Sequence, residues 1–277
     1  WCICTYPALC RASPELAVAA QELGELAGRM NIAPSRMWDL LLQLSVDTPA
    51  NRELAERAMI RAVAPAVRSD SLLTALTSSI ATVKSRFIRD FPEFAKDMKL
   101  RTEPIRCQWE AYGPGLQFQI ATWTQDALMA DEAEVLLVQP IMGGMGYPHL
   151  QTNRCHVEAI LTNADPQLTE SVRIAWLLSQ LEFERPIYSD LINAFRLRAT
   201  AGLAMLPPTL QAADELGICP FSPATVQRAI ELWKLTTPTE DPAALTQIVL
   251  TWWETVEASQ PDWRIALTGL DRMLGAQ

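Results

Sequence analysis

Prolines at the beginnings of apolar runs constrain the fold of this chain more than any other feature. The chain has 19 prolines in 277 residues, and several follow a Ser, Ala, Thr or Asp. Proline suits the first position of a helix because its missing N–H needs no partner there. Behind these prolines, apolar residues recur every three to four positions, which indicates amphipathic helices. The sequence therefore predicts helix starts at Pro14, Pro34, Pro49, Pro92, Pro186, Pro223 and Pro242.

Helical patterns of this kind fill both ends of the chain and leave a different middle. Residues 1–102 and 166–277 carry apolar helical periodicity, and Ser69 or Asp70 adds a further N-cap. Residues 103–165 instead hold five of the 11 glycines and both histidines. We expect one compact domain or two closely packed halves. A degenerate helical solenoid is the alternative, although no fixed repeat period holds along the chain.

The middle segment contains stretches with the pattern of β-strands. Ile105–Tyr112 alternates apolar and polar residues, and residues 113–115 then have the composition of a turn. Glu134–Ile141 is short and apolar, which favours a buried strand. Gly143–Gly146 follows as a loop, and Arg154–Leu161 is a third strand or a short helix. The fold class expected is mainly α, a helical bundle or irregular helical array with an inserted β element of two to three strands.

The charge balance excludes some classes of partner. The chain has 23 Lys and Arg against 32 Asp and Glu, a net charge of -9. Nucleic-acid affinity depends on basic residues that neutralise phosphates, so we expect no nucleic-acid binding. The one basic stretch, residues 84–106, is interpreted as a solvated helix face. The longest apolar runs are far too short for a membrane span, so no membrane partner is expected.

The six cysteines are too few and too dispersed for a disulfide scaffold in a chain of this length. Cys107, Cys155 and Cys219 stand alone in segments that look buried, which favours a reducing, cytoplasmic location and a soluble protein of bacterial type. Cys2, Cys4 and Cys10 lack the second cysteine pair that a structural zinc site needs. The prediction is therefore no bound metal and no cofactor. Because the chain begins at Trp1 and not at a methionine, the sequence leaves open whether further residues precede it.

Two other motifs resemble parts of a phosphate-binding loop and of a cysteine nucleophile site, but the other residues that such sites need are missing. Gly143–Gly146 resembles a phosphate-cradling loop, but Tyr147 and Pro148 follow where a P-loop has Lys and Ser or Thr. Cys155 and His156 are neighbours, so on a strand their side chains point to opposite faces. His149 is the alternative base for Cys155, but nothing in the sequence fixes that contact. The G-x-S-x-G motif of serine hydrolases is missing.

The most concentrated polar chemistry lies between His149 and Glu170. His156 and Glu158 share one face if they lie on a strand, and a histidine–carboxylate cluster suits metal binding or acid–base work. The layout, an apolar strand, then a helix for the metal ligands and then a helix that begins with a glutamate, resembles that of zinc metallopeptidases. Their H-E-x-x-H motif is absent, because no second histidine follows His156 four residues later. The resemblance therefore implies at most an inactive descendant.

The function expected is that of a non-catalytic interaction or ligand-binding protein with a protein or small-molecule partner. The alternative is a hydrolase-like enzyme, or a degenerate metallopeptidase-like protein, that uses the His149–Glu170 region; the residues leave open whether there is any catalysis. The expected cleft has Val135–Val138 as its floor, Gly143–Gly146 as its rim and Glu158 or Glu170 at its wall. Its candidate residues are Trp109, Gly113, Gly115, Gly143, Gly144, Gly146, His149, Asn153, His156, Glu158 and Glu170.

Overall fold

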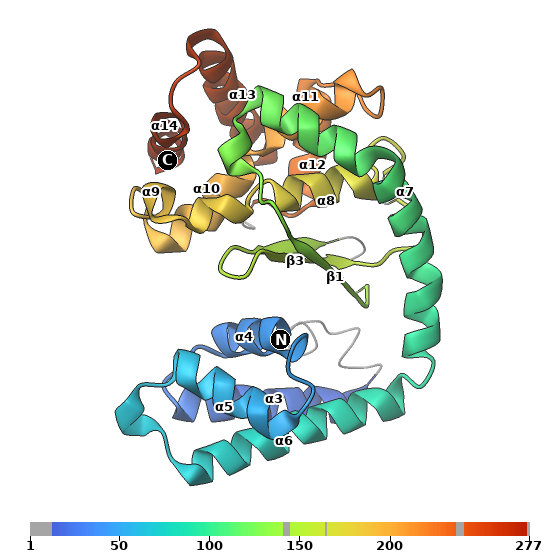
Figure 1. The fold of residues 1–277 in the computed structure, drawn as a ribbon, viewed down its shortest axis with the longest axis vertical. Coiled ribbons are helices and arrows are strands. Elements are labelled where there is room, and N and C mark those ends of the chain that lie inside the picture. The colour runs from blue at the N-terminus through green and yellow to red at the C-terminus, as the bar shows by residue number, and fades with distance from the viewer. Residues whose placement is uncertain (1–12, 141–144, 164, 237–240, 276–277) are drawn as a thin grey trace. The chain divides into compact units, whose positions relative to one another are not determined.

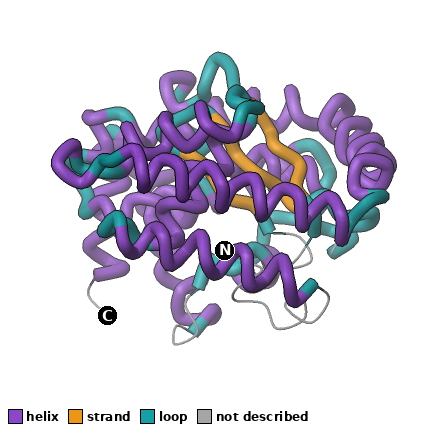
Figure 2. Tube along the Cα trace, turned by 90° about the horizontal axis from the view of Figure 1, so that it is seen from below, coloured by secondary structure: helices purple, strands orange, loops and turns teal. Residues whose placement is uncertain are grey.

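The computed structural model describes residues 13–140, 145–163, 165–236 and 241–275 (Figure 1). Helices make up most of these residues, and one small sheet of three strands is inserted between them (Figure 2). This confirms the predicted fold class. The chain divides into two compact units, Trp1–Lys96 and Asp97–Gln277. No helix among the described residues is long and apolar enough to cross a membrane.

In the described part of the first unit, residues 13–96, four helices pack around one apolar core. Predicted starts at Pro14 and Pro34 are confirmed, because each proline is the first residue of its helix. Ser69 caps the helix that begins at Asp70, as predicted, with its hydroxyl accepting a hydrogen bond from the N–H of Leu72. The helix predicted from Pro49 begins two residues later, at Asn51. The bounds are α3 Pro14–Arg29, α4 Pro34–Ser45, α5 Asn51–Ala62, the short 3-10 turn η1 Pro65–Val67 and α6 Asp70–Asp90.

The prediction of a strand at Ile105–Tyr112 and a turn at residues 113–115 is wrong. Both stretches lie in helix α7, Phe94–Trp123, which also takes in the shorter helix predicted after Pro92. The buried residues of α7 are Ile105, Gly113, Leu116 and Ile120, and their spacing follows one helical face. That buried face outweighs the local signals of Pro104 and Pro114, which remove N–H donors and bend a helix; Figure 1 shows α7 curving along its course.

The sheet combines a parallel and an antiparallel pair. Its strands are β1 Glu134–Val138, β2 Gly146–His149 and β3 Arg154–Glu158, in the order β1-β3-β2. β1 runs parallel to β3, whereas β2 runs antiparallel to it. The predicted strand in residues 134–141 and the strand alternative for residues 154–161 are thus confirmed. Gly146 is the first residue of β2 and not part of a loop, while Gly143 and Gly144 lie outside the described residues.

The remaining helices of the second unit surround a large apolar core. Starts at Pro223 and Pro242 are confirmed, with Ser222 and Asp241 as N-caps. The single helix predicted from Pro186 through Leu197 is instead two, because the chain breaks after Ser189 and restarts behind the N-cap Asn193. The bounds are η2 Asp126–Leu128, α8 Glu170–Leu178, η3 Leu181–Glu184, α9 Pro186–Ser189, α10 Ala194–Ala204, α11 Leu206–Glu215, α12 Pro223–Leu232, α13 Pro242–Ser259 and α14 Trp263–Gly275.

Candidate functional site

The two faces of the sheet carry different chemistry. Side chains alternate along a strand, so the pairing register places Val135, Leu137, Cys155 and Val157 on one face. This face packs against the core with α8. Gly146 lies on the same face, and a Cβ added there would come within 2.4 Å of the Leu177 Cδ1 atom of α8. The glycine therefore lets β2 and α8 approach closely.

The opposite face carries both histidines. His149 Nε2 and His156 Nδ1 are 2.9 Å apart, a hydrogen bond in which one ring donates and the other accepts. The ring of Tyr147 stacks on His156 at a centroid distance of 5.5 Å. The guanidinium of Arg198 lies 4.1 Å from the Tyr147 ring centre, a cation–π contact. The result is a closed cluster of rings and one cation, in which each histidine already contacts the other.

The expectation that Cys155 and His156 face opposite sides of β3 agrees with this register. Cys155 is fully buried, and burial raises the pKa of its thiol to about 12. A thiol with such a pKa stays protonated at neutral pH and is a poor nucleophile. Cys219 is also buried, as predicted, but Cys107 lies exposed on α7, which corrects the expectation for that residue.

The candidate carboxylates are held by other parts of the fold. Glu158 is buried, and its side chain accepts a hydrogen bond from the N–H of Met145 at 3.1 Å. Glu170 begins α8 and forms a buried ion pair with Arg173 one turn later. Arg173 also donates to the main-chain oxygen of Glu158 at 3.1 Å. Burial raises the pKa of Glu170, while the guanidinium of Arg173 opposes that rise. These groups join β3 to the beginning of α8.

Two further candidates have structural positions of their own. Asn153 has a φ of 50°, in the left-handed region, and stands at the end of the turn that joins β2 to β3. Asn tolerates this conformation better than most residues. Gly115 lies on α7, where an added Cβ would come within 3.3 Å of Leu216 Cδ1. Tight packing against residue 216 therefore accounts for this glycine.

A small cavity lies between α7, the end of α8 and the beginning of β1. Its volume is about 210 Å³, below the roughly 300–1,000 Å³ of small-molecule pockets. Trp109 contributes to its wall, and a Cβ at Gly113 would come within 2.4 Å of the Trp109 Cδ2 atom. Gly113 thus lets the indole lie against the helix backbone. The cavity is lined by Trp109, Gln117, Ala130, Ala133, Val135 and Leu178.

Beside this cavity, β1 is an edge strand of the described sheet. Glu134 donates its N–H to the oxygen of Asn153, and the Val138 oxygen accepts from Ala159, so these residues face β3. Peptide groups alternate in direction along a strand, so those of Val135 and Leu137 point away from β3. No described residue forms a backbone hydrogen bond with them. β1 therefore presents two donors and two acceptors in a row.

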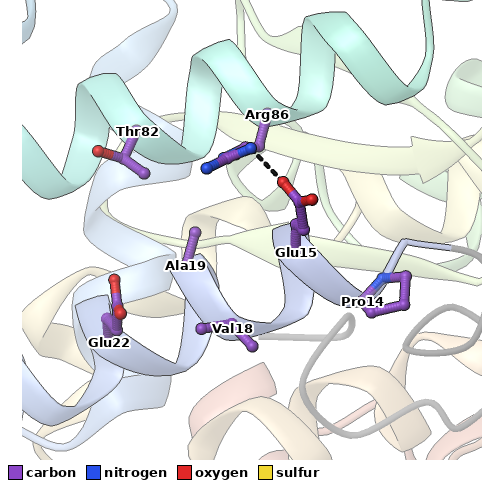
Figure 3. A pocket seen from close by; sticks show the side chains of 7 residues that line it. All are labelled: Pro14, Glu15, Val18, Ala19, Glu22, Thr82 and Arg86. Carbon is purple, nitrogen blue, oxygen red and sulfur yellow. Dashed lines mark hydrogen bonds and ion pairs between the residues drawn. The ribbon is translucent and has the colours of Figure 1, made fainter.

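A second hollow lies within the first unit, between α3 and α6 (Figure 3). Its volume is about 260 Å³. The charged groups Glu15 and Arg86 in its wall form an ion pair with each other, and Arg89 joins them at 2.8 Å from the Glu15 carboxylate. These charges serve to fix α3 on α6. The hollow is lined by Pro14, Glu15, Val18, Ala19, Glu22, Thr82 and Arg86.

The structure brings the predicted residues together at two separate sites. His149 and His156 lie together beside Tyr147, and Trp109 and Val135 both line the cavity. Gln117, Ala130 and Leu178 were not predicted. The signal for Gln117 was the helical spacing of Trp109, Gly113 and Gln117, which places the three on one face once α7 is known to be a helix. No sequence pattern pointed to Ala130 or Leu178.

Within the described ranges, no three His, Cys, Asp or Glu side chains converge as metal ligands do. Comparison with known proteins adds no identity: no family model, no curated protein and no solved structure matches the chain.

Proposed function

We propose that this chain is a non-catalytic binding protein that accepts an extended segment of a partner protein as an additional strand on β1. The observation that carries the proposal is the outward row of peptide groups at Val135 and Leu137. Strand addition of this kind obtains its affinity from main-chain hydrogen bonds and its specificity from pockets for alternate side chains. The cavity lined by Val135 is such a pocket in position and size.

The state of the polar residues supports binding over catalysis. The high pKa of Cys155 disfavours a thiolate nucleophile. Glu158 and Glu170 are engaged with Met145 and Arg173, which suits carboxylates that stabilise a fold. The free thiols of Cys155 and Cys219 accord with a reducing compartment, and a cytoplasmic location is part of the proposal.

The test uses a proline substitution to remove an outward hydrogen-bond donor of β1. In Val135→Pro the outward N–H is lost, whereas the bonds between β1 and β3 come from the neighbouring residues and remain. Peptides of twelve random residues are displayed on phage, selected on the full chain and measured by fluorescence anisotropy. We expect the selected peptides to lose at least tenfold in affinity on Val135→Pro and to keep it on Val135→Thr, which retains the N–H.

The controls separate the edge from the fold and from catalysis. Circular dichroism must show the same helical content and a cooperative unfolding transition in both variants. Equal affinity for wild type and Val135→Pro would refute strand addition. Mass spectrometry of the bound peptides after prolonged incubation tests the hydrolase alternative, since cleavage that stops in His156→Ala would replace the binding proposal with an enzymatic one.

A further inference from the structure

We infer that the β1 edge selects segments with an apolar side chain opposite Val135 and a lysine or arginine beside it. This inference rests on the proposed strand addition and names the chemistry of the segment. Two independent features carry it: the cavity under Val135, and three acidic side chains at the beginning of β1.

The cavity fixes the position of the apolar side chain. In an added strand, the residue opposite Val135 directs its side chain to the same face as Val135, because directly paired residues share a face. On that face lie the walls formed by Trp109, Ala130 and Leu178. A volume of about 210 Å³, below that of small-molecule pockets, suits one apolar side chain such as Leu or Met.

The charges favour a basic neighbour. Asp131, Glu132 and Glu134 are exposed; the first two precede β1, and Glu134 is its first residue. Glu134 is paired with Arg154 on β3, while Asp131 and Glu132 form no ion pair with another described residue. Since a strand rises about 3.3 Å per residue, Glu132 lies within about 10 Å of Val135 along the chain. That exceeds the Debye length of about 8 Å at physiological salt, so a basic side chain gains from these carboxylates only where its own length brings its charge beside them.

The apolar half of the inference is tested by filling the cavity. Ala130→Leu adds three carbons to the cavity wall and leaves the peptide groups of β1 unchanged. Ala127→Leu, on an exposed position of the preceding turn, is the matched control. We expect peptides selected on the wild type to carry Leu or Met next to Lys or Arg. Their affinity should fall at least fivefold on Ala130→Leu and less than twofold on Ala127→Leu.

The electrostatic half is tested by removing two charges. Asp131→Asn with Glu132→Gln should weaken the same peptides at least fivefold at 50 mM salt and flatten the dependence of affinity on salt. Glu22→Gln with Glu254→Gln removes the same net charge at other exposed sites and should change affinity less than twofold.

The outcomes keep the inference separate from the proposed function. If Val135→Pro abolishes binding but the cavity and charge variants do not weaken it, the inferred selectivity is wrong and strand addition stands. If Val135→Pro binds as the wild type does, the proposed function is wrong and the selectivity fails with it. Selected peptides rich in Asp and Glu would also overturn the inference.

Discussion

The glycines of this chain differ in how much space surrounds them. This space determines how a Gly→Ala substitution changes the stability of the fold. At Gly146, an added Cβ would come within 2.4 Å of Leu177 Cδ1 and within 3.2 Å of the main-chain oxygen of His156. At Gly269, within α14, no atom outside the helix's own backbone lies within 4 Å of the added Cβ. The same substitution therefore overpacks one site and only restricts the backbone at the other.

Gly146→Ala is expected to destabilise the protein by about 1–3 kcal/mol, because the buried Leu177 side chain, or the helix that carries it, must move to admit the methyl group. Gly269→Ala should stabilise it by up to about 1 kcal/mol, since alanine favours a helix interior and meets open space. Urea unfolding of both variants at neutral pH measures the free energies of unfolding. Equal effects of the same sign would contradict the packing described at β2.

A buried ion pair leads to a second prediction at this scale. Arg173→Met leaves the Glu170 carboxylate buried without its cation and is expected to cost about 3–5 kcal/mol. The double variant Arg173→Met, Glu170→Gln removes both charges and should recover a large part of that loss. Chemical unfolding of the two variants decides the point, and a double variant no more stable than the single one would speak against a charge effect.

Some helices and strands are determined by their local sequence, and others by tertiary packing. Helix starts at Pro14, Pro34, Pro223 and Pro242 could be predicted because a proline at the first helical position acts locally, and Ser222 and Asp241 add N-cap hydrogen bonds at the last two. Ile105–Tyr112 could not, because its alternation competes with a helical face that becomes visible only with Leu116 and Ile120 included. The cavity beside β1 was out of reach for the same reason, since its walls come from elements whose approach is set by tertiary packing.

The core of the first unit yields a prediction for α6. Leu41, Ala58 and Leu76 are all buried in one cluster, as the helical spacing predicts. Leu76→Ala should therefore cost about 2–5 kcal/mol through lost burial and the cavity left behind. Ile88→Ala on the same helix is the control, because that side chain is 68% exposed and its truncation should change stability by less than about 0.5 kcal/mol. A loss below about 1 kcal/mol for Leu76→Ala would mean that the phase of α6 differs.

The ion pairs that fix α3 on α6 make their contact dependent on pH. The hydrogen bond from Arg89, with the charge of Arg86, holds the pKa of Glu15 below its ordinary value of 4.5. A lowered pKa in the folded state stabilises the fold above the ordinary value and loses that effect as the pH falls through the folded value. Glu15→Gln should thus melt at a lower temperature than the wild type at pH 7.

In acid, below the folded pKa of Glu15, the two melting temperatures should converge. Glu22 lines the same hollow and has no ion-pair partner among the described residues. The melting temperature of Glu22→Gln should therefore equal that of the wild type at every pH. Thermal unfolding followed by circular dichroism gives the comparison, and a Glu15→Gln deficit that persists unchanged in acid would contradict the electrostatic cause.

For the whole molecule, the charge balance sets the class of partner. A net charge of -9 repels phosphate backbones at separations shorter than the Debye length. Binding to duplex DNA at physiological salt should therefore be negligible at micromolar protein, as measured by the anisotropy of a labelled duplex. A salt-dependent rise in anisotropy, lost on Lys84→Glu with Lys99→Glu, would place a basic patch in residues 84–106 against the overall charge.

The edge strand has one more consequence, for the behaviour of the protein at high concentration. The outward peptide groups of Val135 and Leu137, which no described residue pairs with, are also a template for a second copy of the same strand, and such edges promote aggregation. β1 is only five residues long, follows Asp131 and Glu132, and is followed by Pro140 after one residue. Short length, flanking acids and a proline are the features that keep exposed strands from stacking. The acids proposed to recognise a basic segment thus also act as gatekeepers, so their neutralisation should lower solubility even where the fold is unchanged.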